Sequence, residues 1–273
     1  MNARSTLLLA LGLGACASAS EAPPATVVGE ESLGLMDAQG IAIDEAGTRF
    51  LLTGDGRVEE RVDGAWLRRF HAPPGRYFDL AHVEGDRFAI TAPNMGHGLD
   101  LGTRLVTSWF CYFPEDESVR EEQPPTNGQP TEEIARAVAY DARNDFLFAQ
   151  PQTSELDTGR GTFSELAIFT AADGTEQLFR NLGDASFAAG GMVVLDSDDV
   201  GAELLLGRGT MLVYATFPEV TRRDVFDLRS LGVRDIRGLA IDREGGVLEV
   251  LDQRGDEAVL VTLDLDVVLA ATR

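Results

Sequence analysis

Apolar and polar residues alternate along this chain in a pattern that returns at long intervals. Five segments share one form: a run of β-favouring residues, a short polar turn and a second such run. They begin at Gly40 (GIAIDEAGTRFLLTG), Asp79 (DLAHVEGDRFAITA), Ala137 (AVAYDARNDFLFAQ), Gly191 (GMVVLDSDDVGAELLLG) and Gly238 (GLAIDREGGVLEVLD). Between them, no stretch repeats apolar residues at the three-and-four spacing of an amphipathic helix. The pattern predicts an all-β protein built from hairpins.

A second hairpin follows the first in at least three of these segments. Its turn falls at Asp63–Gly64, near Asp173–Gly174 and at Pro218–Glu219. Two hairpins give four strands per repeat, which is typical of a β-propeller blade. The phrase SLGLMDAQGIAID at Ser32 returns as SLGVRDIRGLAID at Ser230, and four intervals of about fifty residues fit between them. We therefore predict a five-bladed propeller over residues 26–273. SLG would end an outermost strand, and GIAID or GLAID would begin the next blade.

The two ends of the chain are expected to meet in one blade. The last repeat supplies three clear strands, GLAID, GVLEVLD and AVLVTLDLD, whereas the remaining VVLAATR is a poor fourth strand. Thr26 to Leu35 can supply that strand, which would close the ring and remove its open edge. In the alternative, the C-terminal tail forms its own fourth strand and a partial sixth blade exists.

The innermost-strand phrases resemble those of NHL-type propellers and, more distantly, those of the gluconolactonase and senescence marker protein family. The resemblance spans most of residues 40–264 and implies a propeller fold. In the lactonases a metal is held by a Glu near the first innermost strand and by Asn and Asp from later blades. Here the matching first position is Gln39 or Asp37, and no Asn precedes the corresponding later strands. This departure weighs against lactonase chemistry.

The N-terminus reads as a secretory signal. MNARSTLLLALGLGAC combines Arg4, an apolar run too short to span a bilayer, and small residues before Cys16. Residues 13–16 (LGAC) resemble the lipobox of bacterial lipoproteins. The resemblance implies a signal peptide over 1–15, a lipidated Cys16 carrying diacylglycerol and a further acyl chain such as palmitate, and a tether over 16–25. Ala17 in place of Asp implies the Gram-negative outer membrane, with the domain facing the periplasm or the cell surface. The alternative is an ordinary secreted protein.

Charge and cysteine content narrow the classes of partner. Asp plus Glu number 45 against 23 basic residues, all of them arginine, for a net charge of -22. Such a field repels phosphate, so no nucleic-acid partner is expected, and the absence of lysine excludes Schiff-base chemistry. Once Cys16 is lipidated only Cys111 remains, so no internal disulfide forms. Cys111 lies in a strand-like run and is expected to be a small buried hydrophobe.

Three long irregular segments are predicted on one face of the ring, where the innermost strands start. They cover 92–102, 151–161 and the stretch around 121–133, and loops of this length are usually functional or disordered. The loop-face candidates are Asn94, His97, Asp100, Glu155, Asp157 and Arg160. A ring of mixed charge at the channel mouth on this face would orient a polar ligand: Asp37, Gln39, Asp79, Arg136, Asp235 and Arg237. Alternatively, these residues form salt bridges between blades and turn caps.

One divalent metal is a further possibility for the same face. Imidazole from His71 and His97 with the carboxylate of Asp79 would suit a transition metal, although no ligand-spacing motif supports it and both histidines can equally be exposed loop residues. His82 is expected to be hydrogen-bonded within its strand. The stretch LDSDDVGAE offers Asp196, Asp198 and Asp199 to calcium, or forms a solvated turn.

The sequence thus supports two functions. The first is a membrane-anchored binding or scaffold module that holds a protein or a small polar envelope ligand on the long-loop face. The second is a divalent-metal-dependent, lactonase-like hydrolase with its site at the channel mouth. No GxSxG, no Cys beside a His and no phosphate-binding loop supports another catalytic mechanism.

Overall fold

The computed structural model of the 273-residue chain describes most of the domain. The described residues are 26–34, 37–71, 77–85, 87–91, 103–104, 108–113, 118–122, 130–131, 134–154, 162–171, 176–181, 189–219 and 221–272. Of these, residues 103–136, 151–165 and 176–181 are described as backbone only. The predicted signal peptide, Cys16, the predicted tether and the residues predicted for the loop face, Asn94, His97, Asp100, Glu155, Asp157 and Arg160, lie outside the described residues.

The described strands form five antiparallel sheets of four strands each. The first sheet contains β2 (Ala38–Ile43), β3 (Arg49–Thr53), β4 (Arg57–Val62) and β5 (Ala65–His71). The second contains β6 (Asp79–Glu84), β7 (Arg87–Thr91), β9 (Ser108–Phe113) and β10 (Ser118–Glu122). The third contains β12 (Ile134–Asp141), β13 (Phe146–Ser154), β14 (Thr162–Thr170) and β15 (Glu176–Asn181).

Two further sheets and one strand pair complete the strand order. The fourth sheet contains β16 (Gly191–Ser197), β17 (Ala202–Arg208), β18 (Met211–Phe217) and β19 (Arg222–Asp227). The fifth contains β20 (Ile236–Asp242), β21 (Val247–Arg254), β22 (Glu257–Asp264) and β1 (Val27–Ser32). A short parallel pair joins β8 (Thr103–Arg104) to β11 (Pro130–Thr131). The predicted all-β fold is confirmed, and Cys111 lies in β9 as expected.

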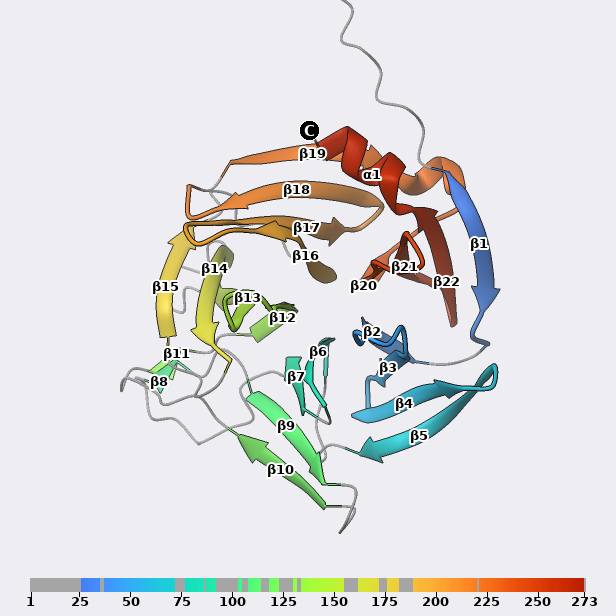
Figure 1. Cartoon of the computed structure of the whole chain (residues 1–273), viewed down its shortest axis with the longest axis horizontal. Coiled ribbons are helices and arrows are strands. Elements are labelled where there is room, and N and C mark those ends of the chain that lie inside the picture. The colour runs from blue at the N-terminus through green and yellow to red at the C-terminus, as the bar shows by residue number, and fades with distance from the viewer. Residues whose placement is uncertain are drawn as a thin grey trace, which may run out of the picture.

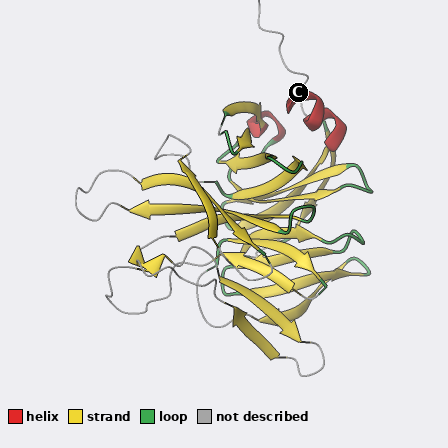
Figure 2. Ribbon diagram, turned by 60° about the vertical axis from the view of Figure 1, so that its left-hand side comes forward, coloured by secondary structure: helices red, strands yellow, loops and turns green. Residues whose placement is uncertain are grey.

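The sheets are arranged around a common axis as a β-propeller (Figure 1). The first strand of each sheet, β2, β6, β12, β16 or β20, is innermost, and each contacts the next in that cyclic order. These are the five strands that the repeated phrases predicted to be innermost. In Figure 2 the sheets are seen obliquely, with the two short helices at one margin of the strands.

The two chain ends meet in the fifth sheet. β1 pairs antiparallel with β22 in a register that places Val27 opposite Leu263 and Ser32 opposite Val259. The backbone N–H of Leu33 continues the pairing by donating to Ala258 O at 2.9 Å. The predicted closure by an N-terminal strand is therefore confirmed, and it covers an edge that β22 would otherwise expose.

The six-bladed alternative required the C-terminal tail to form a strand, and it does not. Residues Leu265–Thr272 form α1, with Leu265, Val268 and Thr272 buried. Asp264 explains where the helix begins, because its Oδ1 accepts the N–H groups of Asp266 at 3.0 Å and Val267 at 3.2 Å. The fourth strand of this sheet comes from β1 instead.

Where the predicted turns are described, they lie at the positions that the sequence predicted. Asp63 and Gly64 connect β4 to β5 with φ of 49° and 82°, as expected of a tight hairpin turn. Pro218 and Glu219 lie between β18 and β19, while 173–174 fall outside the described residues. The prediction that the second SLG ends a strand is wrong. Ser230 lies in the 3-10 helix η1 (Leu228–Leu231), because the side chain of Asp227 caps that turn after β19.

Neither described helix is long and apolar enough to cross a membrane.

Candidate functional site

The innermost strands give the ring two distinct faces. We call the end at which they begin, near Ala38, Asp79 and Gly191, the start face. The opposite end, where β2, β12 and β16 run into their turns, is the end face. The sequence predicted a ligand site on the start face, but the cavity on the ring axis is lined by residues toward the end face.

This central cavity has a volume of about 380 Å³ and is lined by all five innermost strands. Each strand contributes residues from its second half, for example Ile43, His82, Tyr140, Val194 and Ile241. Most of the lining residues are aliphatic, and the polar residues Asp141, Arg143, Asp196, Ser197 and Arg243 come from the strand ends and the turns that follow them. A cavity of this volume that combines aliphatic side chains with convergent polar groups is typical of small-molecule sites.

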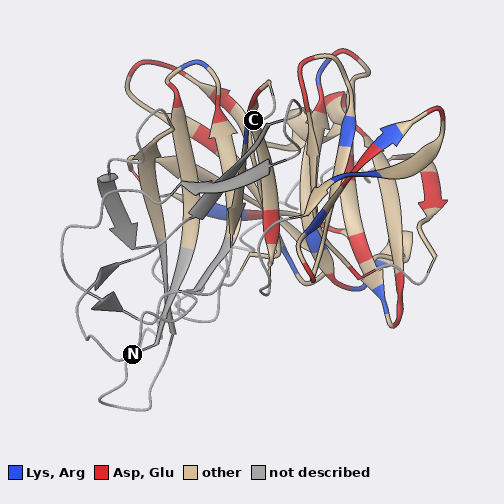
Figure 3. Ribbon diagram, turned by 90° about the horizontal axis from the view of Figure 1, so that it is seen from below, with Lys and Arg blue, Asp and Glu red and all other residues tan. Residues whose placement is uncertain are grey.

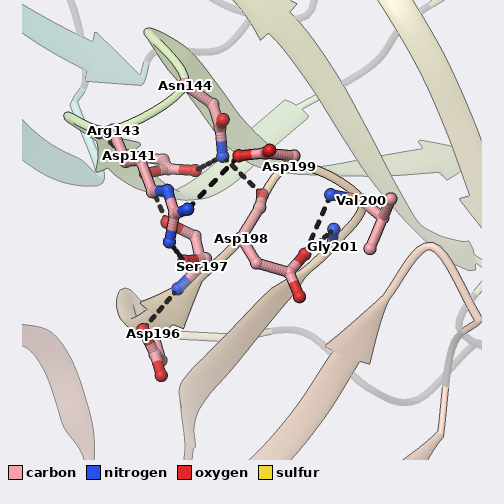
Figure 4. Close-up of polar contacts among 9 residues, drawn as sticks. All are labelled: Asp141, Arg143, Asn144, Asp196, Ser197, Asp198, Asp199, Val200 and Gly201. Atoms are coloured by element: carbon pink, nitrogen blue, oxygen red, sulfur yellow. Dashed lines mark hydrogen bonds and ion pairs between the residues drawn. The ribbon is translucent and has the colours of Figure 1, made fainter.

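Two turns at the opening are locked together by Asp141 and Arg143. Asp141 is buried, and its carboxylate accepts the hydroxyl of Ser197 at 2.8 Å and the amide of Asn144 at 2.9 Å. Arg143 donates to Ser197 O at 2.6 Å and to Asp199 Oδ1 at 3.2 Å (Figure 4). Because Asp141 and Arg143 belong to the third sheet and Ser197 and Asp199 to the fourth, this side of the opening is fixed before any ligand arrives.

The remaining polar side chains of the cavity are also held in place. Arg243 reaches from the fifth sheet to the fourth and donates to Val194 O at 3.0 Å and Leu195 O at 2.8 Å. The hydroxyl of Tyr140 donates to Asp145 Oδ1 at 3.1 Å. Burial, reinforced by the negative charge of Asp145, raises the pKa of Tyr140 to about 12, so the phenol is neutral. His82 is hydrogen-bonded as expected, with Nε2 2.8 Å from Gly85 O.

Asp79 occupies the ring axis beneath the cavity. Its Oδ2 accepts the N–H of Val138 on β12 at 3.0 Å, and the backbone N–H groups of Leu80 and of Met192 on β16 also favour its ionised form. A Cβ on Gly40 of β2 would lie 2.9 Å from Oδ1. This carboxyl group, which belongs to β6, therefore bonds to β12 and leaves no room for a side chain at Gly40 of β2. It is almost fully buried, Oδ1 has no hydrogen-bond partner, and burial raises the pKa of Asp79 well above its ordinary value.

Small residues at the matching positions of the other strands leave room for this carboxyl group. Gly40, Ala137, Gly191 and Gly238 each precede an apolar residue, as Asp79 does. A Cβ on Gly191 would lie 2.6 Å from Gly238 Cα, so the strands are already in close contact at this level. The axis is thus closed by backbone and by Asp79, and the central cavity is a cup that opens toward the end face.

The predicted channel-mouth residues form pairs within their own segments. Asp37 accepts from the side-chain amide of Gln39, and Asp235 pairs with Arg237 at 2.7 Å. Asp79 is buried on the axis, away from any mouth. Arg136 lies on β12, and its side chain is outside the described part. Only Asp235–Arg237 is a salt bridge, and both pairs join residues two positions apart, whereas the alternative interpretation expected salt bridges between blades.

The predicted metal ligands are not brought together among the residues the structure describes. His71 ends β5, the outermost strand of the first sheet, and its Nε2 lies 3.0 Å from Asp55 O, whereas Asp79 starts an innermost strand. Within the described ranges no group of three His, Cys, Asp or Glu side chains is arranged to hold a metal ion. A divalent metal therefore stays a prediction that depends on His97 and other undescribed residues.

The acidic run begins at the end of β16 and continues into a turn. Asp198 Oδ1 accepts the N–H groups of Val200 and Gly201, both at 2.8 Å, and these bonds lower the pKa of Asp198 (Figure 4). Asp199 pairs with Arg143, and Asp196 accepts the N–H of Ser197 at 2.9 Å. The solvated-turn interpretation of this segment accounts for all three carboxylates.

Sequence reasoning missed the polar groups at the end face, although a signal was present. Asp44, Asp141 and Asp242 each end or follow an innermost strand and accept backbone N–H groups of the next turn. An arginine follows within two positions of the second and third of them, as Arg143 and Arg243. Read together, this repeated Asp with a following Arg would have pointed to charged side chains gathered at one end of the ring.

The fold has known counterparts at low sequence identity. A chain of a nidogen–laminin complex matches with a TM-score of 0.52 and 13% identity over 86% of this chain and 78% of its own. The soluble aldose sugar dehydrogenase of Escherichia coli matches with 0.50 and 11%, over 86% and 99%. A gluconolactonase from Xanthomonas campestris matches with 0.49 and 16%, over 84% and 74%. This is a β-propeller. No family model and no curated protein matches the sequence, and likeness at this identity concerns the fold alone.

Proposed function

We propose that this propeller has five blades and is a binding module that takes a small polar ligand, or the end of a larger partner, into the central cavity. The observation that carries the proposal is the cup of about 380 Å³ on the ring axis, lined by every innermost strand. Its volume lies within the range of small-molecule sites. The face differs from the one that the sequence favoured, because the charges gather where the innermost strands end.

The fixed charges at the opening support a polar ligand. Arg143 and Arg243 are exposed there, and each is held by backbone carbonyls of the fourth sheet. Asp196 is exposed at the same opening. Groups that are already ordered lose little side-chain entropy on binding, so they select ligand orientation at low cost.

Ala142 offers a direct test of the cavity. This exposed residue lines the opening in the turn after β12, so Ala142→Trp should block the cup without disturbing the core. Ala46→Trp, at an exposed position in the turn after β2, is the matched control. Thermal unfolding would be followed with sugars, amino acids and polyamines added one at a time. Compounds that raise the Tm of the wild type and Ala46→Trp, but not of Ala142→Trp, would identify the cavity as the site.

Two outcomes would overturn the binding role. If Ala142→Trp responds to every compound as the wild type does, ligand binding lies elsewhere. If the purified wild type contains a divalent metal and hydrolyses a sugar lactone until a chelator is added, the lactonase-like alternative replaces the binding module. That alternative would draw its metal ligands from residues beyond the described ranges.

We also propose that the domain is held at the outer membrane through a lipidated Cys16. Thr26 O accepts the N–H of Asp264 at the end of β22, so the tether joins the domain at the end face. The ten residues 16–25 reach at most about 33–36 Å. The central cavity would then face the bilayer at short range. Radiolabelled palmitate incorporated by the wild type and not by Cys16→Ala, with loss of membrane fractionation, is the expected result; equal labelling would refute the anchor.

A further inference from the structure

A second cavity adjoins the central one on the end face. It has a volume of about 590 Å³ and lies between the β16–β17 turn and the β18–β19 turn of the fourth sheet. Arg143, Asp196 and Ser197 line both cavities. The two cavities are therefore adjacent, and we call them together the end-face groove, which extends from the ring axis outward across the end of the fourth sheet.

The outer part of the groove has an apolar strip. Val200 is 79% exposed at the tip of its turn, and Phe217 and Pro218 line the facing turn. An apolar side chain this exposed on a short turn gains contacts only if something covers it. The strip can therefore contribute affinity to a partner that lies along it.

Acidic residues border this strip. Asp196, Asp198, Glu203 and Glu219 line the second cavity, and Arg143 is the one basic residue among the residues that line it. The charge of Arg143 is already matched by Asp199 at 3.2 Å. The groove is thus negative within a chain whose net charge is -22, and acidic residues, red in Figure 3, recur along the turns. Charge complementarity therefore favours a cationic partner.

The walls of the groove are held in a fixed shape. Asn144 donates to Asp198 O at 2.9 Å, which ties the third sheet to the β16–β17 turn (Figure 4). The hydroxyl of Thr216 donates to Glu219 O at 2.6 Å and lies 2.7 Å from that of Thr221, which closes the β18–β19 turn. A groove with preformed walls suits a partner that adapts to it.

We propose that the end-face groove holds an extended, basic peptide segment of a partner protein, with one end of the segment directed into the central cavity. This inference deepens the proposed binding function and depends on it. Three strand spacings from β16 outward cover about 14 Å, which is four to five residues of extended chain. Alternate side chains of such a segment would reach the apolar strip and the carboxylates in turn. Two adjoining cavities of this size exceed what an inorganic cation needs.

The test uses a fluorescein-labelled octapeptide of alternating Lys and Val, with Glu–Val and Ser–Val versions for comparison. Fluorescence anisotropy with the wild-type domain should show tight binding of the Lys–Val peptide alone, weakening as salt is raised. Glu203→Gln with Glu219→Gln should weaken that binding by about fivefold or more, since each rim charge contributes a factor of about two to five. Val200→Lys should weaken it as well, and its exposed position keeps the fold intact.

The matched control distinguishes the effect of the groove carboxylates on peptide binding from the effect of the protein's overall negative charge. Glu45→Gln with Glu244→Gln removes the same charge from exposed turns on the end face of the first and fifth sheets. Binding should change by less than about twofold in this variant. An equal loss in both double variants, or equal binding of all three peptides, would overturn the proposal. Failure of the Lys–Val peptide to bind would also overturn it. The proposed function would survive either result if the compounds sensitive to Ala142→Trp still bind.

Discussion

The fifth sheet packs against its two neighbours in different ways. Its contact with the fourth sheet is an apolar cluster in which Leu205, Leu212 and Phe226 meet Leu248 and Val250. Its contact with the first sheet closes the ring and joins residues about two hundred positions apart in the chain. That closing contact contains small and aliphatic residues such as Ala38, Leu51 and Leu251, together with charged pairs. Arg49 pairs there with Glu249 at 2.6 Å and with Asp242 at 3.7 Å.

The difference is encoded in adjacent residues of one strand. Leu248 and Glu249 follow each other on β21 and, because side chains alternate along a strand, point to opposite neighbours. Apolar burial is strong but non-directional, whereas a carboxylate–guanidinium pair forms in one geometry. We infer that the fourth–fifth contact supplies mainly stability, and that the closing contact supplies the register in which the chain ends meet.

Leu248→Ala should have the largest effect. Leu248 is fully buried in the apolar cluster, so truncation removes apolar contacts and leaves a cavity that costs about 2–5 kcal/mol of the free energy of unfolding. Urea denaturation of the wild type and the variant measures this. Leu67→Ala, at a position 52% exposed, should change the same quantity by less than about 0.5 kcal/mol. Equal costs at the two positions would show that the cluster is not the main source of stability.

Glu249→Ala should rank second, with a cost of about 1–3 kcal/mol, because it removes the charged acceptor of Arg49. The cost stays below that of Leu248→Ala since the side chain of Arg49 is 31% exposed and water replaces part of the interaction. A cycle with Arg49→Ala tests the pairing. We expect the double variant to be less destabilised than the sum of the single ones. Strict additivity would mean that the two side chains act independently.

Glu249→Gln should have a smaller effect whose size depends on pH. Burial raises the pKa of Glu249 above its ordinary value despite the nearby Arg49, so the folded state holds a proton that the unfolded state releases. The wild type therefore loses stability as pH rises from about 4.5 through the raised pKa. The Glu249→Gln variant cannot bind this proton, so its free energy of unfolding should change less with pH over that window. Thermal unfolding at several pH values measures the slopes, and parallel curves would contradict the assignment.

Much of this architecture could be predicted because short stretches of the sequence determine it. The β-runs with polar turns, the Asp63–Gly64 hairpin and the duplicated phrase all act over a few residues, and they led to the correct innermost strands and to closure by β1. α1 was missed because eight residues carry little periodic signal. What identifies the helix is Asp264, which caps it.

The candidate site was harder to predict because its residues come from different repeats. Asp79 reads as one more polar residue at a strand start, and only the assembled ring shows its carboxyl group buried on the axis and accepting an N–H group from β12. Likewise, the contact of Arg143 with Asp199 joins two turns more than fifty residues apart. A single sequence does not contain the distances between such residues, so the face on which the central cavity lies could not be predicted.

The smallest effect is expected at the outer margin of the closing contact. Glu31 on β1 pairs with Arg61 on β4, and their side chains are 41% and 24% exposed. Glu31→Gln should lower the free energy of unfolding by about 0.5 kcal/mol or less, because water screens the pair and an amide can still accept from the guanidinium. Arg61 also lies over the Trp66 ring at 5.0 Å, so Arg61→Ala should cost more than Glu31→Gln. If Glu31→Gln lowered the free energy of unfolding as much as Glu249→Ala, the exposed Glu31–Arg61 pair would matter as much as the buried Arg49–Glu249 pair. The inference that the buried pair sets the register of the closing contact would then be wrong.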